Sequence, residues 1–228
     1  MADQVHSGHR QRAKAEFLSR GLEGLPDHRV LELILFYALP QGDVNPLAHR
    51  LIDQFGSLAG VLDATAEQLA AIPGVGQHTA VLLKLFPAVG GRYLQGRAAL
   101  GDLIETSWDI RTLFTPYFFG ARNEMVCLAC LDAKHKLLGV RKLGEGSVNA
   151  AEITSRKVVE AALSLNSSVV ILAHNHTSGI AAPSREDILT TRQLFPLLQQ
   201  VGIQLYDHVI LVDDDMLSLR DSGIFSAL

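Results

Sequence analysis

The most informative stretch of the chain is Ser168-Val169-Val170-Ile171-Leu172-Ala173-His174-Asn175-His176. Its β-branched and aliphatic start is typical of a buried central strand. Side chains alternate along a strand, so this strand directs His174 and His176 to the same face. Loops that follow strand ends can open a site, and we therefore expect a functional site where this strand stops.

Strand and helix patterns alternate on both sides of this stretch. Residues 124–131 and 137–143 predict a strand pair joined by a polar turn, and residues 203–212 predict a further strand. Helical patterns cover residues 155–165 and 184–200, with Pro196 expected to interrupt the second helix late. Strands that alternate with helices predict an α/β or α+β sandwich.

The first half of the chain carries helical patterns only. Helices are expected over residues 29–39, from Asn45-Pro46 to about residue 55, and after Thr65 as an N-cap. A further helix is expected over residues 77–86, and Pro87 is expected to kink or break it before a last helical stretch to residue 94. This half is therefore predicted to be all-α.

Length and charge indicate two domains. At about 100–200 residues per domain, 228 residues make one large or two small domains. Residues 1–100 hold nine basic and nine acidic side chains, whereas residues 101–228 hold eleven and fifteen, so the net charge of −4 lies in the second half. Glycines and a loss of pattern at residues 95–102 mark the boundary, which predicts a helical domain at 1–98 and a second domain at 103–228.

Composition excludes several classes of protein. The near balance of 20 basic and 24 acidic residues excludes a uniformly basic nucleic-acid-binding surface, and 48% hydrophobic residues exclude a disordered chain. No apolar run approaches the roughly 18–20 residues that span a bilayer, and the N-terminus lacks the apolar segment of a signal peptide. We therefore expect a cytoplasmic protein with no membrane partner.

The only cysteines, Cys127 and Cys130, have the C-x-x-C spacing of some zinc and redox sites. They fall in a run that predicts a buried strand, and residues three apart on a strand point to opposite faces. One ion could not easily bind both thiols, so we interpret them as core residues.

The strongest candidate site combines His174 and His176 with Asp187. Ten residues lie between His176 and Asp187. Asp187 falls one turn into the helix expected from Ser184, so it can lie beside the imidazoles. Two imidazoles and a carboxylate suit a catalytic zinc ion, one per chain, that keeps a position for water and lowers the pKa of that water to about 7. Spacing alone leaves an alternative open, in which the histidines are loop residues and Asp187 forms a capping box with Ser184.

A longer pattern resembles a known family. Residues 174–179 (His-Asn-His-Thr-Ser-Gly) and 183–187 (Pro-Ser-Arg-Glu-Asp) resemble the signature of JAMM/MPN+ metallopeptidases, and specifically of the RadC family. Residues 201–210 resemble the last core strand of that family, and residues 8–12, 31–37 and 43–48 resemble its N-terminal region. The resemblance implies an α+β protein, in which a small all-α helix-hairpin-helix domain precedes an MPN/JAMM-like (cytidine-deaminase-like) three-layer sandwich.

The resemblance also implies roles for single residues. His174, His176 and Asp187 match the zinc ligands of the family. Ser184 matches the serine that helps to hold the oxyanion of the tetrahedral intermediate. In one departure from the pattern, Thr177 stands where proline usually follows the second histidine. Threonine frees φ and restores an N–H, so we expect zinc binding to survive and any effect of the departure to fall on loop order and activity.

Glu124 matches the glutamate that activates the metal-bound water in the family. Spacing alone does not find this residue, because Glu145, Glu152 and Glu160 compete for the role. Its position favours it, since a lone carboxylate at the mouth of an apolar strand needs a partner or a task. A solvated strand end is the alternative interpretation.

Residues 69–83, around Pro73-Gly74-Val75-Gly76, resemble a helix-hairpin-helix motif. The glycines let the hairpin backbone approach a phosphate closely, and N–H groups at the next helix start can face it. Gly74, Val75 and Gly76 are therefore the predicted DNA-binding residues, and such backbone contacts do not read sequence. Pro-Gly-x-Gly also makes a plain tight turn, so a hairpin that only packs or binds protein is the alternative.

The pair Asp207-His208 could orient a metal ligand, with a structural histidine as the alternative. Together, the residues and the resemblance predict a zinc-dependent hydrolase of peptide or isopeptide amide bonds, acting on a peptide or protein of unspecified identity. The alternative is a DNA-binding or DNA-repair accessory protein whose zinc site is structural or vestigial. Hydrolysis of a nucleic acid or nucleotide is disfavoured, because the deaminase signature needs a Pro-Cys pair that this chain lacks. The sequence leaves the oligomeric state open.

Overall fold

A computed structural model describes residues 2–96, 100–146, 155–213 and 215–227. Contacts divide the chain into two compact units, Met1–Val89 and Gly90–Leu228. The division falls inside helix α6 (Gln77–Gln95). The boundary predicted at residues 95–102 includes residues 97–99, which lie outside the described residues. Among the described helices, none combines the length and the apolar character needed to cross a membrane.

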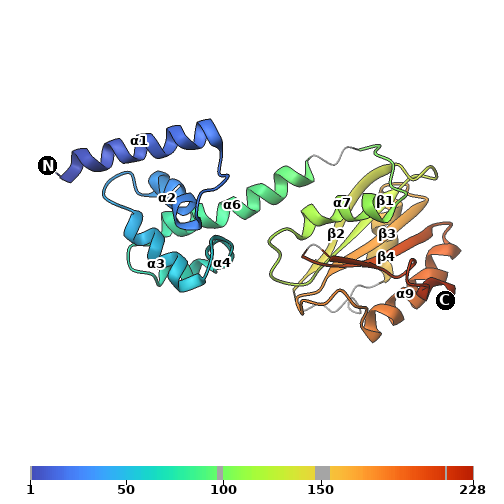
Figure 1. Ribbon diagram of the computed structural model, residues 1–228. Coiled ribbons are helices and arrows are strands. Elements are labelled where there is room, and N and C mark those ends of the chain that lie inside the picture. Colours follow the sequence, from blue (N-terminus) through green and yellow to red (C-terminus); the bar gives the residue numbers. More distant parts are fainter. Residues whose placement is uncertain (1, 97–99, 147–154, 214, 228) are drawn as a thin grey trace. The chain divides into compact units, whose positions relative to one another are not determined.

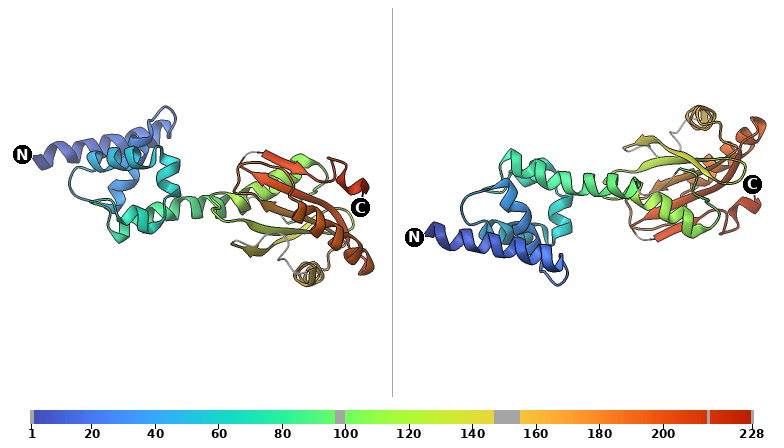
Figure 2. Two further views of the ribbon diagram at one scale, coloured as in Figure 1. Left: turned by 90° about the horizontal axis from the view of Figure 1, so that it is seen from below. Right: turned by 90° about the horizontal axis from the view of Figure 1, so that it is seen from above.

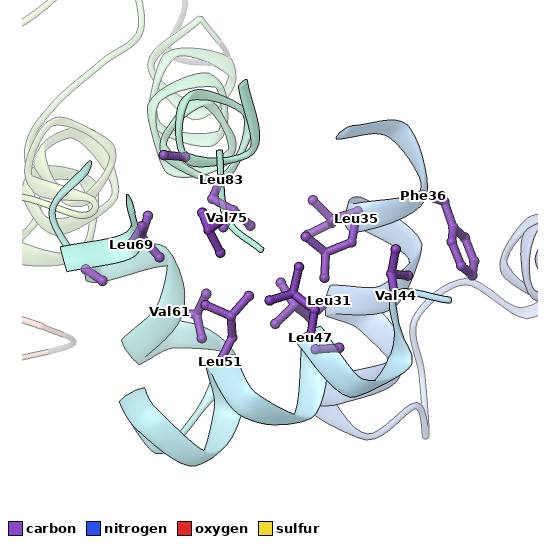
Figure 3. Packing of buried hydrophobic residues seen from close by; sticks show 14 of the residues in the cluster. Leu31, Leu35, Phe36, Val44, Leu47, Leu51, Val61, Leu69, Val75 and Leu83 are labelled. Carbon is purple, nitrogen blue, oxygen red and sulfur yellow. The ribbon is translucent and has the colours of Figure 1, made fainter. Parts of the chain in front are cut away.

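The described part of the first unit is helical, as the sequence predicted. Its helices pack their aliphatic residues into one core, in which Leu31 and Leu35 of α2 lie close to Leu47 and Leu51 of α3 (Figure 3). Val75, from the turn before α6, packs into the same core. The helices are α1 (Ala2–Arg20), α2 (Asp27–Ala38), α3 (Asn45–Phe55), α4 (Leu58–Asp63), α5 (Ala66–Ala70) and the start of α6.

Local signals set several helix ends here. Gly56 ends α3 in the left-handed region with a φ of 83°, and Thr65 begins α5 in a capping box with Gln68. The interruption expected at Pro87 does not end the helix, because α6 continues to Gln95. The helix is packed on both sides of Pro87, which accounts for its continuation. Before the proline, Leu83 is fully buried in the core of the first unit. After it, Gly90 lies so close to Phe119 that a Cβ at this position would be 3.3 Å from the ring.

The second unit contains a five-stranded mixed sheet, which confirms the α+β class (Figure 1). The strand order is β2-β1-β3-β4-β5, in which β3 and β4 are parallel and the other neighbours antiparallel. The strands are β1 (Met125–Leu131), β2 (Leu137–Glu145), β3 (Val169–Asn175), β4 (Gln204–Val212) and β5 (Asp215–Ser218). The stretch from Val169 is therefore the central strand, and every residue of β3 is buried.

Helices cover both faces of this sheet and make three layers (Figure 2). Helix α7 (Ser107–Phe118) packs on one face, and α8 (Ser155–Ser164) and α9 (Arg185–Gln200) pack on the other. A short 3-10 helix, Ile224–Ala227, follows β5. Helix α7 and strand β5 were not predicted. The aromatic, β-branched and proline content of α7 gives it low intrinsic helix propensity, and its start depends on the capping box between Thr106 and Asp109.

The two cysteines are free and buried, and they occupy opposite faces of β1. Cys127 packs with the α7 side, whereas Cys130 packs with the α8 and α9 side. Burial raises the pKa of the Cys127 thiol to about 12 and also raises that of Cys130. Both are therefore protonated at neutral pH, and their interpretation as core thiols is confirmed.

Candidate metal centre

The end of β3 and the start of α9 form the candidate site. His174 is the penultimate residue of β3, and His176 follows the strand and donates its backbone N–H to Leu211 O at 3.0 Å. Helix α9 connects the parallel strands β3 and β4, so its first turn returns to the end of β3 and carries Asp187. Ligand sites in such sheets lie at the carboxyl ends of the parallel strands.

Three side chains converge there. His174 Nε2 lies 2.9 Å from His176 Nε2 and 3.2 Å from Asp187 Oδ1, and His176 Nε2 lies 3.3 Å from Asp187 Oδ2. The side chains of His174 and Asp187 are 3% exposed and that of His176 is 13% exposed, so solvent reaches the cluster on the His176 side. Among the described residues, these three form a group whose ligand atoms lie within 4.8 Å of one another.

Ser184 holds the Asp187 carboxylate from the end of the helix. Its backbone N–H and its Oγ both donate to Asp187 Oδ2 at 2.7 Å, and Asp187 N donates back to Ser184 Oγ at 3.1 Å. The capping box considered as an alternative to the metal site is therefore present together with the histidine contacts. The two interpretations are compatible, because the cap fixes the carboxylate in place while Oδ1 faces His174.

The charge of Asp187 follows from these contacts. Burial by itself raises the pKa of this carboxyl, but the hydrogen bond and charge of His174 and the hydrogen bonds from Ser184 outweigh burial and hold the pKa below its ordinary value. Asp187 is therefore ionised at neutral pH. One carboxylate and two imidazoles are ligand types that suit divalent transition metals, so the donor set fits a metal ion.

A buried chain of contacts lies behind His174. Its Nδ1 lies 2.9 Å from His208 Nε2, and His208 Nδ1 lies 2.7 Å from Thr191 Oγ1. The Thr191 hydroxyl donates to the backbone carbonyl of Asp187 at 2.6 Å. Burial, together with the charge of His174, lowers the pKa of His208 to about 3, so this imidazole is neutral at physiological pH.

The Asp207 side chain is not part of this chain of hydrogen bonds. Its carboxylate accepts hydrogen bonds from Ser218 Oγ at 2.6 Å and from the backbone of Arg220 at 3.1 Å, and it contacts His208 through the backbone N–H at 2.7 Å. Of the predicted pair, His208 alone contacts a candidate ligand. Thr191 was missed, although its position one helical turn after Asp187 signals that the two share a face.

Asn175, between the two histidines, fixes the chain around Glu124. Its Oδ1 accepts from Met125 N at 2.7 Å and its Nδ2 donates to Asn123 O at 3.1 Å. The antiparallel register pairs Val126 with His174, so Glu124, just before β1, precedes the end of the sheet at which β3 presents the histidines. Glu124 lies outside the cluster of ligand atoms.

Two of the glutamates that competed with Glu124 have other partners. Glu145, at the end of β2, pairs with Lys142, and Glu160 on the exposed side of α8 pairs with Arg156 at 2.6 Å. Glu152 lies outside the described residues.

The predicted DNA-binding residues lie in the turn before α6. Gly74 has a φ of 96°, which favours glycine, whereas Gly76 is exposed and a Cβ there would meet nothing within 4 Å. Val75 is 6% exposed, so its side chain belongs to the core and only its backbone could contact a phosphate. Arg50 Nη2 donates to Pro73 O at 3.2 Å and brings a cation to the turn, whereas Lys84 Nζ donates to Leu62 O at 2.7 Å.

A family model described as "RadC-like JAB domain" matches residues 104–224, which include the sheet and the candidate site. The chain belongs to the RadC family. It is 36% identical over 216 residues to a UPF0758 protein of Ruegeria pomeroyi, covering 94% of this chain and 96% of that one. It is also 36% identical over 212 residues to a UPF0758 protein of Rhodobacter capsulatus, covering 92% and 99%. In this RadC-family member, the residue after the second histidine is the exposed Thr177, so the departure from the usual proline lies at the surface.

Proposed function

We propose that this RadC-family protein is a zinc-dependent metallopeptidase that hydrolyses peptide or isopeptide amide bonds. The observation that carries the proposal is the convergence of His174, His176 and Asp187 at the end of the central strand. Each is held by contacts outside the cluster or by the strand itself, and the donor set leaves a coordination position for a further ligand.

The spacing of the donor atoms favours zinc. Zinc bonds of about 2.0–2.1 Å at tetrahedral angles place neighbouring ligand atoms about 3.3 Å apart. The imidazole nitrogens lie 2.9 Å apart, and each lies 3.2 or 3.3 Å from a different oxygen of the Asp187 carboxylate. A small shift of the imidazoles would therefore accommodate one zinc ion per chain.

A zinc ion held by His174, His176 and Asp187 would lower the pKa of water to about 7 and polarise a carbonyl group. In the proposed reaction, the Glu124 carboxylate accepts a proton from the attacking water and later donates it to the leaving amine. Asn175 supports this role, because it holds the backbone on both sides of Glu124 and so fixes where the side chain begins.

Ser184 is proposed to donate a hydrogen bond to the oxyanion of the tetrahedral intermediate. Its hydroxyl donates to Asp187 Oδ2 in this structure. Its backbone N–H donates to the same oxygen, so the carboxylate keeps a hydrogen bond when the hydroxyl turns toward an oxyanion.

The test uses a peptide library prepared from a cell digest, with an added lysine peptide that carries an ε-amide-linked second peptide. Zinc-loaded protein is incubated with both, and new amino groups are identified by mass spectrometry. We expect cleavage by the wild type and none by Glu124→Gln. Equal product formation by both proteins would contradict the proposed role of Glu124, and no product from either would contradict amide hydrolysis for these substrates.

A second proposed activity is non-specific contact with DNA through residues 74–76, which Arg50 beside the turn favours. This contact would place a helix start and a guanidinium against phosphates. It is compatible with the first proposal, and without hydrolysis it would leave a DNA-associated protein whose zinc site is structural.

A further inference from the structure

We propose that Thr191 and His208 are positioning residues that fix a proton of His174 on Nδ1 and thereby leave its Nε2 as the nitrogen that faces the metal position. This inference rests on the proposed metal site. It concerns which nitrogen of each buried imidazole carries its single proton, a choice that the hydrogen-bond partners determine.

The argument begins at Thr191, which has one hydroxyl proton. Its oxygen lies 2.6 Å from the carbonyl oxygen of Asp187, and a carbonyl has no proton to donate. Two oxygens at this distance need a proton between them, so the threonine donates its proton to the carbonyl. The threonine oxygen then has only lone pairs to offer to other groups.

His208 is the next group in the chain. Its Nδ1 lies 2.7 Å from the Thr191 oxygen, so Nδ1 carries the proton and donates it to that oxygen. The side chain has no exposed surface, and neither ring nitrogen contacts a carboxylate, so a second proton would leave a buried cation without a partner. The Nε2 of His208 is therefore an acceptor.

His174 completes the chain. Its Nδ1 lies 2.9 Å from the His208 acceptor, so Nδ1 carries the proton and donates it. Its Nε2 lies 2.9 Å from His176 Nε2 and 3.2 Å from Asp187 Oδ1, so a proton on this nitrogen is shared with the carboxylate in the absence of metal, and a metal ion would take the place of that proton. A metal binds imidazole only through an unprotonated nitrogen, and because Nδ1 donates to His208, Nε2 is the nitrogen of His174 that remains for the metal.

This chain of hydrogen bonds begins and ends at candidate metal ligands, Asp187 and His174. Thr191 donates to the backbone of Asp187, whose carboxylate faces the nitrogen of His174 that remains for the metal. Helix α9 thus supplies one metal ligand and, one turn later, the hydroxyl that determines the protonation of another. A shift of α9 relative to β3 and β4 would disturb both together.

The first test reads the protons directly in metal-free protein. Long-range ¹H–¹⁵N spectra of ¹⁵N-histidine-labelled protein distinguish the two neutral forms of each ring, and His208→Gln and His174→Gln assign the signals. We expect both His174 and His208 to be protonated on Nδ1. A His174 whose Nδ1 is unprotonated in the wild type would overturn the proposal.

The second test removes the hydroxyl. Without an acceptor for its Nδ1 proton, His208 in Thr191→Val is expected to move the proton to Nε2 and donate to His174 Nδ1, which puts the His174 proton on Nε2. We expect zinc affinity, measured by competition with a fluorescent chelator, to fall by roughly 10–100-fold. Thr191→Ser restores the hydroxyl and should bind as the wild type does, and Thr190→Val, at the neighbouring buried threonine, is the matched control.

The outcomes separate this proposal from the metal site itself. Wild-type zinc affinity in Thr191→Val would overturn the positioning role, as would an equal loss in Thr191→Ser or Thr190→Val. Failure of the wild type to bind zinc would contradict the proposed function, while the imidazole spectra of the metal-free protein would still decide the proton positions. Expected proton positions and a loss restricted to Thr191→Val would support the proposal.

Discussion

His174 and His208 lie on adjacent parallel strands, with Nδ1 of the first 2.9 Å from Nε2 of the second. The register pairs His208 with Leu172, so the two imidazoles are directed to the same face of the sheet, the one covered by α9. This relationship orients a candidate ligand from within the core, whereas Ser184 orients Asp187 from the helix end. The sheet and helix α9 therefore both hold the candidate metal centre in place.

Glu124→Gln is expected to retain zinc and to lose amide hydrolysis. The amide keeps the shape of the side chain but cannot accept the proton of the attacking water, and general acid–base catalysis contributes about 10²–10⁴-fold. Zinc content and peptide cleavage are measured on the same preparation. Glu145→Gln, which removes a carboxylate paired with Lys142, is the matched control and should cleave normally. Loss of zinc in Glu124→Gln would instead make Glu124 a ligand or a folding residue.

Asn175→Asp is expected to retain zinc and to lower hydrolysis. A carboxylate accepts from Met125 N but cannot donate to Asn123 O, so the backbone around Glu124 loses one of its two fixed contacts. Small misplacements of a reacting group can lower the rate about 10²-fold, and the fall should appear in kcat more than in KM. Asn166→Asp makes the same change on the surface and should have no effect. Unchanged kcat in Asn175→Asp would refute the positioning of Glu124 by this amide.

The stability of metal-free protein is expected to fall as the pH drops from about 6.5 toward 3. The pKa of His208 is about 3 in the folded protein, because of burial, and about 6.5 in the unfolded chain. Between these values the unfolded chain binds more protons, so lowering the pH favours unfolding. Melting temperature is measured against pH in the presence of EDTA.

The melting temperature of His208→Gln should decline less steeply with falling pH than that of the wild type over this range, because glutamine does not titrate. His78→Gln, at an exposed histidine, is the control for removing any histidine and should follow the wild-type profile. Identical slopes for His208→Gln and the wild type would show that His208 is not held neutral in the fold.

Gly76→Glu and Arg50→Ala are expected to weaken DNA binding and to flatten its dependence on salt. A Cβ at Gly76 meets nothing within 4 Å, so the new carboxylate should repel phosphate without distorting the turn. Affinity for a duplex of arbitrary sequence is measured by fluorescence anisotropy over a salt series. Ala66→Glu, at an exposed position at the start of α5, is the charge-matched control. If the affinity of the wild type for the duplex did not change with salt concentration, DNA binding would be excluded from the proposed function.

The sequence predicted the central strand, and its spacing together with the family resemblance predicted the meeting of its two histidines with Asp187. Alternation fixed the face of the histidines, and helical spacing put Asp187 in the first turn of α9. Residues 34 apart in the chain, such as His174 and His208, are brought together by strand pairing, which here includes a register shift between Val170 and Ile171. No local pattern encodes such a shift, so the sequence could suggest that the pair Asp207-His208 orients a metal ligand but could not show that His208 contacts His174.

The weakness of local signals also explains the elements that were missed. Helix α7 is stabilised by Ile110, Leu113 and Phe114, which are buried against the sheet, rather than by its own propensity. Strand β5 spans only Asp215–Ser218 and forms by pairing with β4. Both depend on tertiary contacts that the linear pattern does not contain.

The central claim is that His174, His176 and Asp187 bind one zinc ion, and metal analysis tests it most directly. Protein is equilibrated with zinc, freed of excess by gel filtration and analysed by atomic emission, alongside His174→Ala/His176→Ala and the control His78→Ala. We predict about one zinc per chain in the wild type and the control, and none in the double variant. Sub-stoichiometric zinc in the wild type that is unchanged in the double variant would contradict the claim.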